Sequence, residues 1–201
     1  MRQSSILLNC ANSIDWDSKR ETEASQSVIA SAFRLEDLSC NLPRDSEATY
    51  EGLADAILKG PVKTLRKLNF SSIMSKEIQF NPFFGSIEEL TRLSGQVQNL
   101  ESLSFHFHHK AMNAHDTDHC FLVSEKCKVL DRLLDDARAF PSLKEVQISF
   151  IVSVRDDSRY GIFVLEDEFK AASLDIKEHS FQNLKGNATI KFIFDLEMEW
   201  R

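Results

Sequence analysis

The sequence predicts an α/β protein in which a parallel sheet carries helices on one side. Two observations predict this fold: a short apolar pattern, Leu-x-x-Leu-x-Phe, recurs along the chain, and amphipathic stretches separate its copies. The last two apolar positions of each copy lie two residues apart, as expected for a strand with one buried face. Strands that alternate with helices are typical of parallel sheets, because each crossover places a helix behind the sheet.

The apolar pattern has three clear copies and two looser ones. The clear copies are LRKLNF at 65–70, LESLSF at 100–105 and LKEVQI at 143–148, and the looser ones are LEDLSC at 35–40 and IKFIF at 190–194. The first four copies start about 30, 35 and 43 residues apart, beyond the roughly 20–29 residues of a regular leucine-rich repeat. This spacing predicts an irregular leucine-rich-repeat-like solenoid, in which each unit buries its apolar face against the next. A compact α/β domain whose strands share an apolar pattern is the alternative.

Three stretches between the copies have the period of an amphipathic helix. The first, Ser46 to Lys59, ends at Gly60-Pro61, a strong stop signal. The second, Ser86 to Val97, begins with a Ser and reaches Glu89 three residues later, which is the spacing of a capping box. The third, Ser124 to Ala139, ends before Phe140-Pro141. We expect each helix to pack behind the strands that flank it.

The length of the chain indicates one domain. With 201 residues, 42% of them hydrophobic, it can bury a substantial core. Residues 1–24 have weak periodicity and run into the polar stretch DSKRETEAS. We therefore expect a loosely ordered amino-terminal arm over residues 1–24, followed by one leucine-rich-repeat-like domain over residues 25–201.

The net charge and the distribution of apolar residues limit the classes of partner and the cellular location that we expect. The net charge of −7 disfavours broad attraction to nucleic acid or to an anionic membrane. No apolar stretch approaches the roughly 20 residues that span a bilayer, and the run Ile6 to Leu8 is too short for a signal peptide. The four cysteines form no CxxC pair, which indicates reduced thiols. We expect a cytoplasmic or nuclear protein with neither a nucleic-acid nor a membrane partner.

A histidine-rich stretch, FHFHHKAMNAHDTDHC at 105–120, is the strongest candidate for metal chemistry. If Phe105 and Phe107 face the core, His106 and His108 both point away from it on the opposite face of the strand. Two histidines placed in this way could chelate zinc. His115 and His119 could add ligands, which would make the chain a zinc-binding protein or a metal-dependent hydrolase that uses the His106–Cys120 cluster. The competing interpretation, which we favour, is a strand followed by a polar loop without a metal.

Other signatures of enzyme chemistry are missing from the sequence. Gly60-Pro61-Val62-Lys63 is not a phosphate loop, and neither Gly-x-Gly-x-x-Gly nor Gly-x-Ser-x-Gly occurs. Cys120 lies beside His119, but adjacent residues rarely contact each other in a strand or loop. We therefore expect no catalytic residues, no cofactor and no enzyme activity.

The polar residues that alternate with the apolar ones are the candidate binding residues. In a solenoid they lie on the open face of the sheet, where partners bind. Their mixed charge favours a protein or peptide partner. The candidates are Arg66, Lys67, Asn69, Glu101, Ser102, Ser104, His106, Lys144, Glu145, Gln147 and Ser149.

Three phrases, PVKTLRKLNF, QNLESLSFHF and FPSLKEVQISF, resemble the divergent leucine-rich-repeat regions of fungal F-box-like proteins. The resemblance covers roughly residues 60–198 and implies a substrate-recognition domain without catalysis. An F-box before the repeats would imply docking to a ubiquitin ligase. Leu42-Pro43 matches the start of such a module, but RDSEATYEGLADAILKG then leads directly into the first clear copy. The three-helix module has no room there, so we expect neither an F-box nor ligase docking.

The sequence thus favours a non-enzymatic protein-interaction domain of leucine-rich-repeat type. The zinc-binding alternative depends on the histidine-rich stretch. A degenerate fragment of a longer gene, without a role of its own, is a third possibility. A curved parallel sheet with helices on one side would support the first interpretation.

Overall fold

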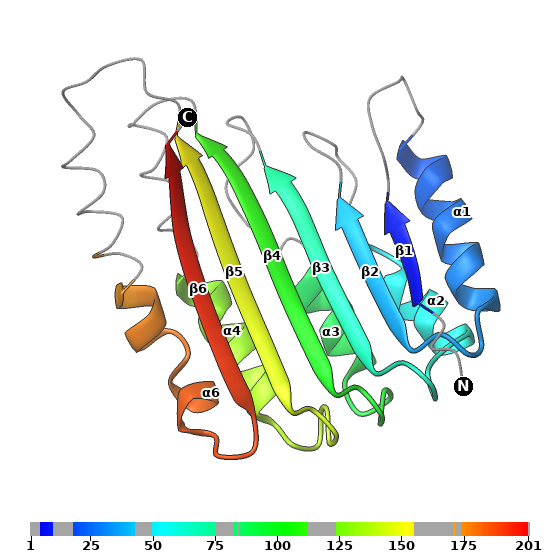
Figure 1. Cartoon of the computed structure of the whole chain (residues 1–201). Helices are drawn as coiled ribbons and strands as arrows, with labels where there is room; N and C mark the ends of the chain where they lie inside the picture. Colours follow the sequence, from blue (N-terminus) through cyan, green and yellow to red (C-terminus); the bar gives the residue numbers. More distant parts are fainter. Residues whose placement is uncertain are drawn as a thin grey trace.

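The structure is a computed structural model, and strands alternate with helices along it (Figure 1). It describes residues 5–9, 18–42, 50–74, 83, 85–111, 124–154, 171 and 174–200. The strands are β1 Ser5–Asn9, β2 Asp37–Leu42, β3 Lys67–Met74, β4 Ser102–Ala111, β5 Glu145–Val154 and β6 Lys191–Trp200. The helices are α1 Ser18–Ser31, α2 Leu53–Lys59, α3 Ser86–Leu93, α4 Ser124–Asp135 and α6 Gln182–Gly186.

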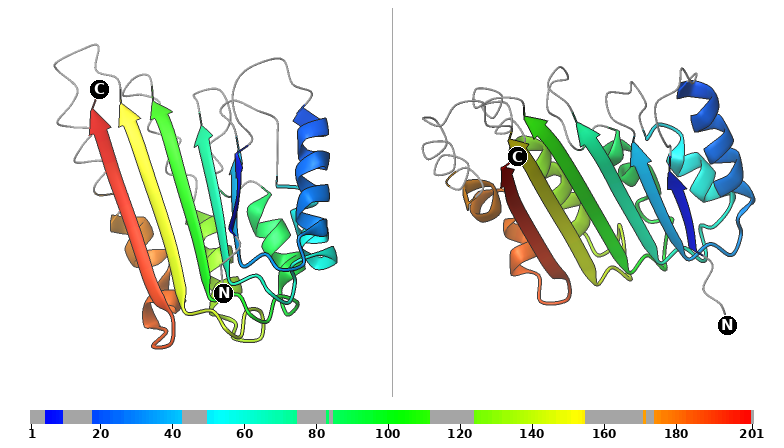
Figure 2. Two further views of the ribbon diagram at one scale, coloured as in Figure 1. Left: turned by 45° about the vertical axis from the view of Figure 1, so that its right-hand side comes forward. Right: turned by 45° about the horizontal axis from the view of Figure 1, so that its top comes forward.

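The six described strands form one sheet in the order β1-β2-β3-β4-β5-β6, and every neighbouring pair is parallel. Each crossover therefore returns the chain to the next strand along the sheet. Helices α2, α3 and α4 lie behind the sheet in Figure 1 and stay on that side in both views of Figure 2. The α/β class, the parallel sheet and its helices agree with the fold expected from the sequence.

The strand register aligns the five copies of the apolar pattern. The fourth position of each six-residue copy forms one row across the sheet, and the sixth position forms a second row, in which Phe70 pairs with Phe105 and Phe105 with Ile148. In the five-residue copy at 190–194, Phe192 and Phe194 take these two places. Both rows face the helices, and their residues in β3, β4 and β5 are fully buried. The first row consists of Leu38, Leu68, Leu103, Val146 and Phe192.

Aromatic rings fill the space between the sheet and the helices. Phe70 and Phe105 stack with their ring centroids 5.3 Å apart, and Phe83 meets Phe105 edge-on at 5.5 Å. Phe83 also contacts Phe107, which lies 5.2 Å from Phe150. Such pairs add about 0.5–1.5 kcal/mol each beyond the burial of their area. This cluster holds neighbouring strands to the same helix layer.

The amino-terminal region, for which we expect a loosely ordered arm over residues 1–24, contains a strand and the start of a helix among its described residues, 5–9 and 18–24. Strand β1 pairs with β2 from Ser5↔Asp37 to Asn9↔Asn41, and α1 begins at Ser18 and packs against α2. The sequence signal was weak because β1 is an edge strand with only three consecutive apolar residues, Ile6 to Leu8. The sheet and its helix layer thus begin before residue 25.

The three expected helices are present with shorter bounds, and the predicted capping box is wrong. The amino-terminal cap of α3 is Gly85, at φ 75°, and it makes no side-chain cap. Ser86 donates its hydroxyl to the Phe83 carbonyl, and the carboxylate of Glu89 points to a different helix. No described helix is both long and apolar enough to cross a membrane. Residues 43–49, where an F-box would begin, lie outside the described residues.

Candidate functional site

The face of the sheet opposite helices α2–α4 is the candidate site, and we call it the open face. Alternation along each strand places every second side chain on it. On β4, for example, Leu103, Phe105 and Phe107 are buried against the helices, and His106 between them is exposed. Because the register is parallel and unbroken, equivalent positions of neighbouring strands lie side by side in rows.

The candidate binding residues divide into two groups in the structure. Eight occupy open-face positions of β3, β4 and β5: Lys67, Asn69, Ser102, Ser104, His106, Glu145, Gln147 and Ser149. The other three, Arg66, Glu101 and Lys144, lie one residue ahead of these strands, at the amino-terminal edge of the sheet. There their backbones are joined by hydrogen bonds from Glu101 N to Arg66 O and from Lys144 N to Glu101 O.

Ion pairs neutralise much of the charge at this amino-terminal edge. Arg66 Nη1 lies 2.7 Å from Glu101 Oε1, and Lys144 Nζ lies 3.5 Å from Glu101 Oε2. On the open face next to them, Lys191 Nζ lies 3.0 Å from Glu145 Oε2. Exposed pairs of this kind stabilise a protein by about 1 kcal/mol or less. Their main effect here is to leave little net charge at the edge.

Short polar side chains fill the centre of the open face. The amide of Asn69 donates to Asp37 Oδ1 at 3.2 Å and to Ser39 Oγ at 3.0 Å, which ties β3 to β2. Ser104, in the next strand, is buried although it lies on this face. Small side chains allow another backbone or side chain to approach the sheet closely. The surface is therefore suited to contact with a partner.

His106 and His108 occupy successive open-face positions of β4, as the sequence predicts for a strand. Partial desolvation on the sheet lowers the pKa of His106, which favours the neutral form of its ring. Nε2 of His108 lies 2.7 Å from Ser153 Oγ, and the Ser153 hydroxyl donates to Glu199 Oε2 at 3.1 Å. With its hydrogen directed to Glu199, Ser153 Oγ accepts the Nε2–H of His108.

This chain of hydrogen bonds has the residue types of a catalytic triad in a different order. A nucleophilic serine needs a histidine that accepts its proton and an acid that orients that histidine. Here the serine lies between the two, donates to the carboxylate and is buried. The arrangement joins β4, β5 and β6 and does not activate Ser153. The buried thiol of Cys127 is inert for a related reason, because burial raises its pKa.

The described residues contain no group of three or more His, Cys, Asp or Glu side chains that could hold a metal ion. Of the four histidines weighed as ligands, His106 and His108 are described. His115 and His119, together with Cys120, lie outside the described residues. The structure therefore brings together only the strand half of the histidine-rich stretch.

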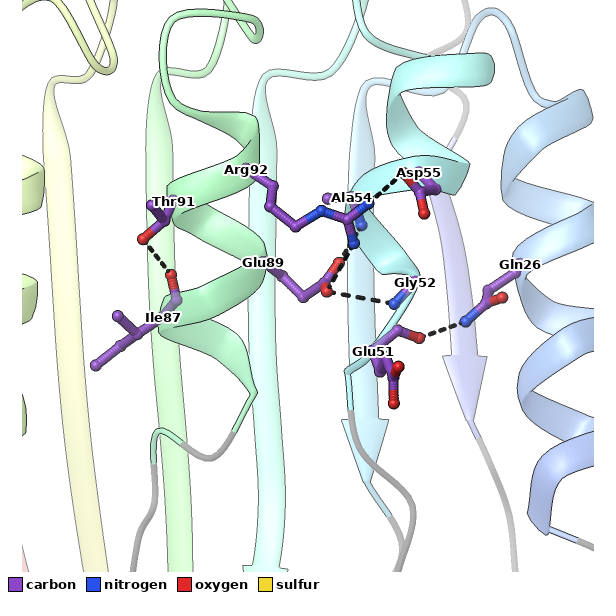
Figure 3. A network of polar contacts seen from close by, with 9 residues as sticks. All are labelled: Gln26, Glu51, Gly52, Ala54, Asp55, Ile87, Glu89, Thr91 and Arg92. Atoms are coloured by element: carbon purple, nitrogen blue, oxygen red, sulfur yellow. Dashed lines mark hydrogen bonds and ion pairs between the residues drawn. The ribbon is translucent and has the colours of Figure 1, made fainter.

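Two buried carboxylates lie in the helix layer, and both receive backbone N–H groups. Glu89 of α3 accepts hydrogen bonds from Gly52 N at 3.3 Å and Ala54 N at 2.5 Å, at the start of α2 (Figure 3). Arg92, 3.2 Å from Glu89, also pairs with Asp55 of α2. The free amino-terminal N–H groups and the dipole of α2 favour this carboxylate. The role of Glu89 is therefore structural.

Asp131 of α4 does the same for α6. It accepts hydrogen bonds from Asn183 N at 3.1 Å and Leu184 N at 2.9 Å, at the start of α6. Burial raises the pKa of Asp131 more than these hydrogen bonds lower it. No described Lys or Arg forms an ion pair with Asp131, in contrast to Glu89. These buried acids are thus occupied by helix termini, and the open face remains the candidate site.

The carboxyl-terminal part of the open face was missed by the sequence analysis. There Ile73, His108, Ile151 and Glu197 form one row across β3 to β6, and Asp195 lies in the row before it. The signal was present, because the period of two continues past the sixth residue of each copy. The looser copy at 190–194 ended just before the two acidic residues.

Comparisons with protein families, with curated proteins and with solved structures find no match for this chain. Function is therefore inferred from the geometry of the open face.

Proposed function

We propose that this chain is a non-enzymatic protein-interaction domain, an irregular leucine-rich-repeat-like solenoid that binds a protein or peptide partner across its open face. The observation that supports it is the sheet order: six parallel strands follow one another in sequence, and α2, α3 and α4 cover the same side (Figure 1). The opposite side offers rows of polar side chains to a partner. Solenoids bind partners on such surfaces.

The aligned copies of the apolar pattern support the solenoid. In a compact α/β domain the strand order commonly reverses at a switch point, and ligands bind in the crevice outside it. Here the order does not reverse among the described strands, and each unit contacts mainly the units before and after it. A row of pattern positions continues from β2 to β6 without a shift of register. This arrangement favours repetition of one structural unit.

The resemblance to fungal F-box-like proteins places the proposed role among substrate-recognition domains, in the cytoplasm or nucleus. The mixed charge of the open face favours a protein or peptide over nucleic acid. We do not propose ligase docking, because the sequence between Leu42 and the first clear copy has no room for the module. Among the described residues, no observation favours zinc binding as a second function.

Affinity capture from a cell extract, with single-residue variants of the intact chain, tests the proposal. Lys67→Ala, Glu101→Gln and Lys144→Ala should each reduce capture of the same partner. Lys126→Ala on α4 and Glu88→Gln on α3 are matched controls, because both residues are exposed on helices. All five variants should keep their stability within about 0.5 kcal/mol, as is usual for surface changes. A partner whose capture depends on Lys126 or Glu88, on the helix side of the sheet, contradicts the proposal.

A further inference from the structure

The charges of the open face are balanced at one end and unbalanced at the other. At the amino-terminal ends of the strands, Glu145 is paired with Lys191. Toward the carboxyl-terminal ends, Asp195 and Glu197 lie two residues apart on β6, exposed on the same face. Neither carboxylate forms an ion pair with any described residue. A cation from another molecule thus gains most at the second end, because no described side chain competes there.

Apolar surface lies beside these carboxylates. Ile73 of β3 is 38% exposed, and Ile151 of β5 is partly exposed. Both isoleucines neighbour His108 in one row, and Glu197 is the next member of that row. Covering an isoleucine side chain is favourable by about 25 cal/mol for each Å² removed from water. The row therefore presents an apolar platform with an acidic border.

We propose that this carboxyl-end patch, formed by Ile73, Ile151, Asp195 and Glu197, docks a segment of a partner protein that carries a large apolar side chain and a nearby Lys or Arg. The apolar side chain lies over His108, between the two isoleucines, and the cation lies against the two carboxylates. This inference rests on the proposed partner-binding function and specifies the chemistry of the partner.

The strand spacing sets the separation of the two partner groups. Neighbouring strands lie about 4.8 Å apart, so a group over β4 and a group over β6 are roughly 10 Å apart. An extended chain advances about 3.3 Å per residue. The basic residue therefore lies two to four positions from the apolar one, given the reach of a Lys or Arg side chain. A segment that crosses the strands satisfies both contacts at once.

The negative charge of the carboxyl-end patch favours some binding partners over others. Nucleic acid and an anionic membrane surface are repelled by the carboxylates of Asp195 and Glu197. A second copy of the chain brings a net charge of −7 of its own. A cationic segment of a different protein is the occupant that the charges favour.

Selection from a phage-displayed library of random twelve-residue peptides on the intact chain tests the inference. The enriched peptides should carry Lys or Arg two to four positions from a large apolar residue. Their affinity should fall about tenfold or more on the double variant Asp195→Lys/Glu197→Lys, which places like charges opposite the peptide. The double variant Glu23→Lys/Glu88→Lys makes the same change in net charge at exposed residues of α1 and α3, and should leave their affinity unchanged.

Ile73→Ser separates the apolar contribution from the charge. It should weaken the same peptides while leaving their preference for Lys or Arg intact. Enrichment of neutral or acidic peptides overturns the inference, as does an equal loss on both double variants. If the enriched peptides instead depend on Lys67 and Lys144, the inference fails and the proposed function stands. A selection that enriches no peptide over an unrelated control protein overturns both.

Discussion

The two faces of the sheet differ in how tightly their side chains are packed. On the covered face, Phe105 is completely buried and contacts the rings of Phe70, Phe83 and Phe107. One residue further, on the open face, His106 is exposed. The covered face is close-packed, so small changes of volume there are costly. We expect substitution of exposed open-face residues such as His106 to leave the fold intact.

The largest effect is expected from truncation of the central aromatic residue. Phe105→Ala removes a fully buried ring and leaves a cavity in the aromatic cluster between the sheet and the helices, so we expect a loss of about 3–5 kcal/mol in the free energy of unfolding. Urea denaturation measures it. His106→Ala is the matched control on the neighbouring residue and should cost less than about 1 kcal/mol. Similar losses for the two variants would mean that the open face is also packed.

A smaller loss is expected at the contact between helices. Glu89→Ala leaves Gly52 N and Ala54 N without their acceptor and should cost about 2–3 kcal/mol. Glu88→Ala, one residue earlier and exposed, should change the free energy of unfolding by less than about 0.5 kcal/mol. Chemical denaturation of both variants provides the comparison. A loss at Glu88 as large as that at Glu89 would contradict a role specific to the cap of α2.

The difference between the faces also explains what could be predicted from the sequence. The spacing of two between Leu103 and Phe105 identified a strand with one buried face, because alternation follows directly from strand geometry. Glu89 was assigned to its own helix because a spacing of three carries no information about a neighbouring helix. The end of α2 that it caps is 35 residues away in sequence. Contacts of that kind depend on packing and leave no local pattern.

On the open face, too, contacts between distant parts of the chain could not be predicted from the sequence. Alternation along the strand was enough to predict that His106 lies on the open face. The ion pair between Arg66 and Glu101 could not be predicted, because it depends on the register between two strands, which the sequence does not determine. The row that joins Ile73 to Glu197 combines four strands from distant parts of the chain. None of its members is unusual within its own strand. The patch becomes visible only when the rows are aligned.

A pH-dependent effect is expected at His106. Desolvation lowers its pKa in the folded chain below the ordinary value of 6.5, so the unfolded chain binds the proton first. The contribution to stability is fully present above pH 6.5 and is lost as the pH falls through the folded pKa. His106→Gln should therefore make the free energy of unfolding less sensitive to acidification below pH 6.5. Urea denaturation of both proteins at several pH values tests this, and parallel curves would contradict it.

The smallest effect is expected from removal of metal. Two histidines supply at most two of the four ligands that zinc takes, and among the described residues no group of three or more His, Cys, Asp or Glu side chains could complete the set. Nε2 of His108 is also engaged, because it lies 2.7 Å from Ser153 Oγ, whose hydroxyl donates to Glu199. We therefore expect zinc near zero in the purified protein after mild chelation, and no change in Tm on addition of a chelator. About one zinc ion per chain, lost in His108→Ala, would contradict this and show that the open face binds through a metal.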